Sequence, residues 1–192
     1  MTKPELLFEL SKINAKRVNR LRVSNLILAD KDSFKPLLEM VFDYNNKTSI
    51  KAAWILEFVC KEKLEWLLEN IDYFTKNISK VHLESAVRPV AKVLEMLISA
   101  CHKNIGLYQI STKNKERIIE TTLDWMISKH KIAIKVYSMQ TLYYLGLEHT
   151  WIHEELQEIL SRNILTESAG YKARAKKIIA LIDKASLKNK KK

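Results

Sequence analysis

Apolar residues recur at intervals of three and four along most of the chain, which is the spacing of one face of an α-helix. The pattern predicts ten helices. One follows residue 14, and the other nine cover residues 4–13, 34–42, 48–59, 63–78, 87–98, 118–127, 132–145, 151–164 and 169–182. Because most of the connections between them are short, consecutive helices are expected to run antiparallel. We therefore predict an all-α fold of five helix pairs.

Residues that begin and end helices fit these boundaries. Asp32 and Ser33 are expected to cap the third helix, and Thr48 or Ser49 the fourth, because their side-chain oxygens accept hydrogen bonds from free backbone N–H groups. Gly146 is the predicted C-terminal cap of the eighth helix. Residues 102–112 are predicted to form a longer connection.

The second helix of four pairs carries the same short pattern, an apolar residue, then a basic residue, then a core residue three positions later. The four instances are Ile50-Lys51 with Trp54, Val87-Arg88 with Ala91, Ile134-Lys135 with Ser138, and Tyr171-Lys172 with Ala175. The first and last intervals between the basic residues are about 37 residues, and the middle interval is longer by about the length of segment 102–112. This period predicts a solenoid of two-helix repeats.

The pattern resembles that of the HEAT and armadillo-like family, whose second helices often carry a further apolar residue four positions after the small one. Tyr171-Lys172 with Ala175 and Ile179 matches closely, whereas Trp54 replaces the small residue and Glu95 stands where an apolar one is expected. The resemblance covers residues 31–185 and implies an α-α superhelix of about five antiparallel HEAT-like pairs. It implies no activity, because this architecture serves scaffolds, adaptors and a few enzymes.

Length and composition support one helical body. A chain of 192 residues with 47% hydrophobic content can bury one continuous core. We expect a single HEAT-like domain over residues 1–183 and a basic, disordered tail over 184–192. Because there is no signal peptide and no apolar run of roughly 18 residues, the expected location is the cytoplasm. Cys60 and Cys101 are expected to be reduced, buried thiols.

The sequence offers little for catalysis, and we expect a non-catalytic protein without cofactor or metal. Only three glycines are present, so loops that cradle phosphates have little raw material. His149 and His153 share a helix face at a spacing that suits a metal, but a third ligand and the glutamate of a zinc protease are missing. Cys101 and His102 are adjacent, which points their side chains about 100 degrees apart on a helix and disfavours a catalytic dyad.

Two further groups of residues are assigned to structure. Glu57 and Glu95 lie on apolar helices and are expected to form salt bridges with a Lys or Arg of a neighbouring repeat. Trp151 begins a helix and is expected to be accessible. The tryptophans inside apolar stripes are expected in the core: Trp54, Trp66 and Trp125.

Basic residues give the one patterned polar signal in a chain of net charge +11. The second helices carry basic pairs four residues apart, which project from one side of a helix: Lys16 and Arg20, Lys47 and Lys51, Arg88 and Lys92, Lys131 and Lys135, and Lys172 and Lys176. Because the HEAT resemblance implies that second helices line the concave face, the last four pairs are the candidate residues of an anion- or nucleic-acid-binding groove. The alternative is a solvated surface, because the pairs are not in the same register.

These observations favour a helical-repeat binding scaffold or adaptor with a basic surface and a protein or peptide partner. The alternative is a nucleic-acid-binding protein similar to the HEAT-like DNA alkylation repair glycosylases, which clasp duplex DNA in a basic concave surface. The catalytic aspartate and flanking tryptophans of that family have no assignable counterparts here, so no catalytic residue is carried over. No membrane association is expected.

Residues 13–20 also resemble the beginning of short chains that are labelled adenylosuccinate lyase. Members of the lyase superfamily are much longer, are tetrameric in their active form, and carry a mobile serine-rich loop with a Met-Pro step. This chain contains no Met-Pro dipeptide. The resemblance therefore implies no lyase activity.

Overall fold

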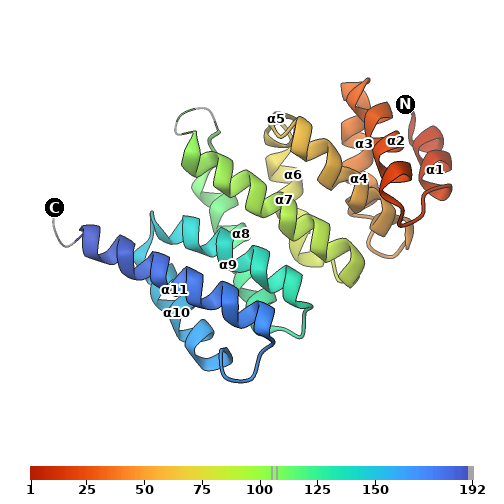
Figure 1. The fold of residues 1–192 in the computed structure, drawn as a ribbon. Helices are drawn as coiled ribbons and strands as arrows, with labels where there is room; N and C mark the ends of the chain where they lie inside the picture. Colours follow the sequence, from red (N-terminus) through yellow and green to blue (C-terminus); the bar gives the residue numbers. More distant parts are fainter. Residues whose placement is uncertain (105, 107, 190–192) are drawn as a thin grey trace. The chain divides into compact units, whose positions relative to one another are not determined.

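A computed structural model describes residues 1–104, 106 and 108–189, and over this part of the chain every regular element is helical (Figure 1). The α-helices are α1 (Lys3–Ser11), α2 (Arg17–Leu28), α3 (Phe34–Val41), α4 (Thr48–Glu62), α5 (Glu65–Leu68), α6 (Ile71–Asn77), α7 (Glu84–Lys103), α8 (Thr112–Ile127), α9 (Ile132–Gly146), α10 (Thr150–Asn163) and α11 (Ala169–Asn189). The 3-10 turn η1 (Lys31–Ser33) precedes α3, and η2 (Ile78–Lys80) follows α6. The predicted all-α class is confirmed.

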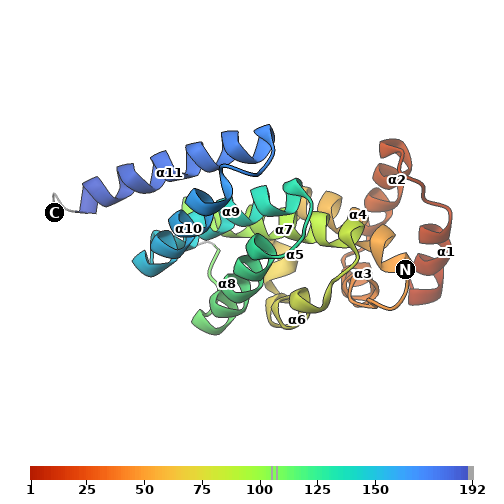
Figure 2. The ribbon, with the colours of Figure 1, turned by 90° about the horizontal axis from the view of Figure 1, so that it is seen from below.

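The structure divides into two compact units, an N-terminal unit, Met1–Ile118, and a C-terminal unit, Ile119–Lys192, with the boundary inside α8. In the N-terminal unit α4 is the central helix, because α2, α3 and α7 all pack against it. Figure 2 shows α3 and α6 on one side of this unit and α4 and α7 on the other. First and second helices of successive pairs thus form two layers, which is the arrangement of a HEAT-type solenoid.

The core of the N-terminal unit lies between its two layers. Ala52 and Ala53 of α4 are fully buried, and their small side chains allow neighbouring helices to approach closely. At the first-helix side, the rings of Phe34 and Trp66 pack edge to face with centroids 5.8 Å apart. Trp66 is buried, as the sequence predicts.

In the C-terminal unit, α9 packs against both α10 and α11. Leu142 of α9 and Tyr171 of α11 are fully buried. The Asn163 amide donates a hydrogen bond to the Tyr171 hydroxyl at 3.4 Å, and burial raises the pKa of that hydroxyl. The phenol therefore contributes both buried area and a partner for the end of α10.

The first helix begins with a capping box that the sequence analysis did not identify. The backbone N–H of Thr2 donates to the Glu5 carboxylate at 2.8 Å, and the N–H of Glu5 donates to the Thr2 hydroxyl at 3.4 Å. The hydrogen bonds from Thr2 hold the pKa of Glu5 below its usual value. Two backbone donors of α1 are thus satisfied without any other helix.

Several helix boundaries differ from the prediction. The single helix expected over 63–78 is broken into α5 and α6 around Asn70, whose side-chain amide donates to the Trp66 carbonyl at 3.0 Å and so competes with the backbone for it. Helix α8 begins at Thr112, earlier than expected. Helix α11 continues to Asn189, so residues 184–189 of the expected tail are helical, and residues 190–192 lie outside the described part.

Gly146 does not cap α9 in the predicted way. It is the last residue of α9, and among the described residues only Gly106 has a positive φ. A Cβ at position 146 would lie 2.0 Å from Cδ2 of His153. The glycine is therefore required by the close approach of the His153 ring and not by a left-handed backbone.

A buried polar cluster joins α6 to the beginning of α8 within the N-terminal unit. The Thr75 hydroxyl donates to the Asn114 side-chain oxygen at 2.7 Å, and the Asn114 amide donates to Asp72 at 2.8 Å. Arg117 donates to the same Asn114 oxygen at 3.1 Å. Thr75 and Asn114 are each only 2% exposed, so the cluster fixes the register of the two first helices in a place that water does not reach.

Candidate binding surface on the second helices

The basic residues at the shared position of the repeat pattern are Lys51, Arg88, Lys135 and Lys172, and each has a partner within its own unit. Lys51 donates to the Ser11 carbonyl at the end of α1 at 2.8 Å, and Lys172 donates to the Leu165 carbonyl at 3.2 Å. Lys135 is only 8% exposed and pairs with Glu167 at 2.8 Å. These cations therefore stabilise the connections between helices.

The other members of the predicted pairs are more accessible. Lys47 and Lys131 are exposed at the residues that precede α4 and α9, and Lys176 is exposed on α11. Lys92 of α7 pairs with Glu95 at 2.6 Å on the same helix. The eight candidate residues are divided between the two units, with four in each.

Glu57 is the centre of an ion-pair network between two second helices. It is 7% exposed and accepts hydrogen bonds from Lys61 of α4 and from Arg88 of α7, both at 2.9 Å. The predicted salt bridge from Glu57 to a neighbouring repeat is confirmed. Glu95 instead pairs within its own helix. This buried carboxylate with two cationic partners links α4 to α7.

Arg20 of α2 is held by aromatic rings. Its guanidinium carbon lies 5.7 Å from the ring centroid of Trp54 and 5.4 Å from that of Phe58. Its Nε is buried without a hydrogen-bond partner. Trp54 is only partly buried, which corrects the expectation that it belongs to the core, and its indole N–H donates to the Ser85 carbonyl at 3.1 Å.

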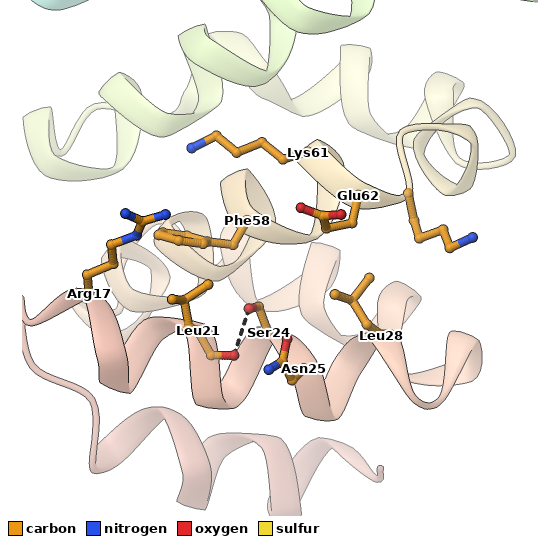
Figure 3. A pocket seen from close by; sticks show the side chains of 9 residues that line it. Arg17, Leu21, Ser24, Asn25, Leu28, Phe58, Lys61 and Glu62 are labelled. Atoms are coloured by element: carbon orange, nitrogen blue, oxygen red, sulfur yellow. Dashed lines mark hydrogen bonds between the residues drawn. The ribbon is translucent and has the colours of Figure 1, made fainter.

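A depression of about 550 Å³, here called the α2–α4 pocket, lies between the second helices of the first two pairs. Figure 3 shows Arg17 and Leu21 of α2 facing Phe58 of α4 across it, with Glu62 nearer to Leu28 at the other end. The Lys61 ammonium lies 4.9 Å from the Phe58 ring centroid. The pocket is lined by Arg17, Leu21, Ser24, Asn25, Leu28, Phe58, Lys61, Glu62 and Lys63. It combines an apolar floor with a cationic end.

A second depression of about 530 Å³, here called the α4–α7 pocket, adjoins the first. It lies between the end of α4 and the C-terminal half of α7, and Lys61 and Glu62 line both pockets. Met96, Ser99 and Tyr108 contribute partly exposed side chains to it. The two pockets together form a surface that crosses three successive second helices.

The candidate catalytic and metal-binding residues are not brought together. His153 is 7% exposed, stacks on the ring of Tyr143, and donates from Nε2 to the Tyr143 carbonyl at 2.8 Å, whereas His149 is exposed. No cluster of three His, Cys, Asp or Glu residues that suits a metal is present in the described residues. Cys60 is fully buried, which raises the pKa of its thiol, and Cys101 is partly exposed.

The predictions for the two remaining tryptophans are confirmed. Trp125 is 2% exposed and Trp151 is 52% exposed, as expected. None of the described helices is both long enough and apolar enough to span a bilayer.

Sequence reasoning missed the role of Arg20 and the two pockets. Trp54 and Phe58 are four residues apart on α4, a spacing that places two rings on one face, and this was the available signal for an aromatic platform. Which cation covers that platform depends on how α2 packs against α4. Periodicity within one helix does not contain that information.

Comparison with known proteins relates the chain to a family of helical-repeat proteins. No curated protein and no solved structure matches the chain significantly. The family model for the HEAT repeat domain matches residues 5–182. This match covers most of the chain and agrees with the stacked helix pairs seen in the structure. The chain therefore belongs to the HEAT repeat family.

Proposed function

We propose that this protein is a non-catalytic scaffold that binds a protein or peptide partner along the second helices of its N-terminal unit. Helical repeats offer extended surfaces for partners, and the present chain combines such a surface with two adjoining pockets. The observation that carries the proposal is that both pockets share Lys61 and Glu62, so a single ligand can occupy them together.

The mixed chemistry of the two pockets supports a peptide. Leu21, Leu28 and Phe58 offer apolar contacts in the first pocket, and Met96 and Tyr108 offer adaptable ones in the second. Acidic residues are interspersed with the lysines, because Glu62 and Glu95 line the second pocket. A surface of alternating charge suits a peptide of defined sequence better than a uniform polyanion.

The test is a selection of random peptides displayed on phage against the full chain, followed by NMR mapping of a selected synthetic peptide on isotopically labelled protein. The expected result is that perturbed amides cluster on α2, α4 and α7. Asn25→Trp, which fills the first pocket, should abolish binding. Asn45→Trp adds the same bulk at an exposed turn residue that lines neither pocket, and it should bind normally.

Two results contradict the proposal. One is the failure of any peptide to bind the folded chain. The other is a cluster of perturbed amides on the first helices α3 and α6. Equal binding by Asn25→Trp and Asn45→Trp would remove the first pocket from the binding surface.

Nucleic-acid binding is the second candidate, similar in kind to that of the HEAT-like DNA alkylation repair glycosylases. The observation that favours it is the exposure of Lys47, Lys131 and Lys176 in a chain of net charge +11. Arg88 and Lys135, in contrast, are paired with glutamates. Neither candidate requires a cofactor, and we expect no adenylosuccinate cleavage by the purified chain.

A further inference from the structure

The guanidinium of Arg20 has an environment that suits an anionic ligand. Stacking on Trp54 and Phe58 orders the side chain without using its outer N–H donors. None of the carboxylates in the described structure pairs with it, whereas Arg22 on the same helix pairs with Glu9 at 2.6 Å. A group that is ordered in advance loses less side-chain entropy when it binds.

Arg20 does not line the α2–α4 pocket itself but lies beside it, against Phe58, and Arg17 adds a second guanidinium that does line the pocket. It lies three residues before Arg20, so both side chains leave α2 on the same side, and it lines the pocket in an exposed position. The charge of Lys61 is partly neutralised by Glu57 at 2.9 Å. The two arginines therefore place two guanidinium groups next to each other at this end of the pocket.

We propose that Arg20, which lies beside the α2–α4 pocket, binds the carboxylate of an acidic residue in a peptide partner with the assistance of Arg17, and that the residues after the acidic one enter the pocket. This inference rests on the proposed scaffold function and adds the chemistry of the ligand. Guanidinium groups bind carboxylates through paired, charge-assisted hydrogen bonds. Leu21 and Leu28 then receive an apolar residue that follows the acidic one.

Glu62 argues for a peptide rather than a nucleic acid. It lines the same pocket at the end near Leu28, and it repels a second anionic group placed there. A nucleic-acid strand carries a phosphate at every nucleotide and so cannot avoid this carboxylate. A peptide can place an acidic residue at Arg20 and a neutral residue at Glu62. This surface therefore selects for a ligand that is negatively charged at one end and neutral at the other.

The probe is a fluorescein-labelled synthetic peptide in which a Glu-Glu step is followed by leucine and alanine, measured by fluorescence anisotropy with the full chain. The matched peptide carries Gln-Gln in place of Glu-Glu and should bind at least about tenfold more weakly. Arg20→Met keeps an aliphatic side chain against the rings and should weaken binding of the acidic peptide by about the same factor. Arg20→Lys should bind the acidic peptide with an affinity between those of the original chain and Arg20→Met, because it keeps the charge but loses the planar guanidinium.

The control for net charge is Arg162→Met on α10. Arg162 is exposed and pairs with Glu158 on its own helix, so this variant removes one positive charge away from the pocket and should bind the acidic peptide normally. In addition, Glu62→Gln should strengthen binding of a peptide that carries acidic pairs at both ends, because the repulsion by Glu62 is removed. Circular dichroism should show the same helix content for all variants.

The outcomes separate this inference from the proposed function. If peptides bind at α2 and α4 but Glu and Gln versions bind equally, or Arg20→Met has no effect, the carboxylate site is wrong and the scaffold proposal stands. If Arg162→Met weakens binding as much as Arg20→Met does, only net charge is involved and the site is also wrong. A duplex DNA probe that binds more tightly than the peptide and depends on Arg20 overturns the peptide assignment. If no peptide binds at all, both proposals fail.

Discussion

At the residue scale, the structure shows that single side chains at helix ends fix how neighbouring helices pack. Gly146 provides space for the His153 ring, which stacks on Tyr143 with centroids 5.6 Å apart and donates to its backbone. The ring is nearly buried and has two partners, so it is not free to move aside. The end of α9 and the beginning of α10 are thereby joined through one imidazole.

Replacement of Gly146 by alanine tests this contact. The new methyl group would lie 2.0 Å from the His153 ring, so Gly146→Ala should lower the free energy of unfolding by about 1–3 kcal/mol. Gly170→Ala is the matched control, because its new methyl group would lie 3.9 Å from the Ser168 hydroxyl, an ordinary van der Waals distance, and it should be neutral or slightly stabilising. Urea denaturation followed by circular dichroism measures both variants. Equal stability of the two variants would contradict the packing argument.

Leu142 is a fully buried residue of α9 and stands four positions after Ser138, where the family pattern carries a further apolar residue. Leu142→Ala should cost about 2–5 kcal/mol of unfolding free energy, because it removes buried methyl groups and leaves a cavity. Leu187→Ala on α11 provides the control, since Leu187 is 62% exposed and should change little. Chemical denaturation that shows no difference between them would remove Leu142 from the core.

At the element scale, most helices were predictable because their apolar stripes are buried in the structure. Tyr171 and Ala175 of the family pattern are fully buried, whereas Ile179 is only half-buried. The break at Asn70 was not predictable from periodicity, because it depends on a side chain that competes for a backbone carbonyl. For the same kind of reason the aromatic contacts of Arg20 were missed, since they join residues more than 30 positions apart.

The Asn114 cluster yields a prediction about the contact between α6 and α8. Asn114→Ala removes the acceptor at 2.7 Å and leaves the buried Thr75 hydroxyl with only the longer contact to the Asp72 carbonyl at 3.4 Å, so it should destabilise the protein by about 1–3 kcal/mol. Hydrogen exchange should also become faster in both helices. Asn104→Ala is the control, because its exposed side-chain amide donates to the Ala100 carbonyl of the helix that it follows, α7. If both asparagine variants are equally stable, the cluster does not hold the two helices together.

At the scale of the whole molecule, the net charge of +11 has to be separated from the candidate surface. Part of it belongs to a run of lysines near the end of the sequence: Lys184, Lys188, Lys190, Lys191 and Lys192. Ion pairs such as Arg88 with Glu57 add nothing to it, because the two charges cancel. Composition therefore overstates the positive charge that remains for a partner.

Duplex DNA distinguishes the two candidate functions. We expect weak binding that falls steeply with salt, because each neutralised phosphate contributes about −0.9 to the logarithmic slope. A chain that ends at Asp183 should lose most of this binding, and reversal of Lys47, Lys131 and Lys176 to glutamate should then change little. These lysines are exposed, whereas reversal of Arg88 or Lys135 would also break ion pairs. If the triple reversal abolishes binding by the shortened chain, the nucleic-acid candidate replaces the scaffold.

The different partners of the shared basic position restrict how this protein can evolve by gain or loss of repeats. Arg88 pairs with a glutamate of the preceding second helix, Lys135 pairs with one in the following repeat, and Lys51 binds a backbone carbonyl. A duplicated or deleted repeat would therefore join a cation to a neighbour that lacks its acceptor. Although the repeats share a sequence pattern, they are not interchangeable modules, and insertion of a consensus repeat would have to supply a new acceptor at each junction.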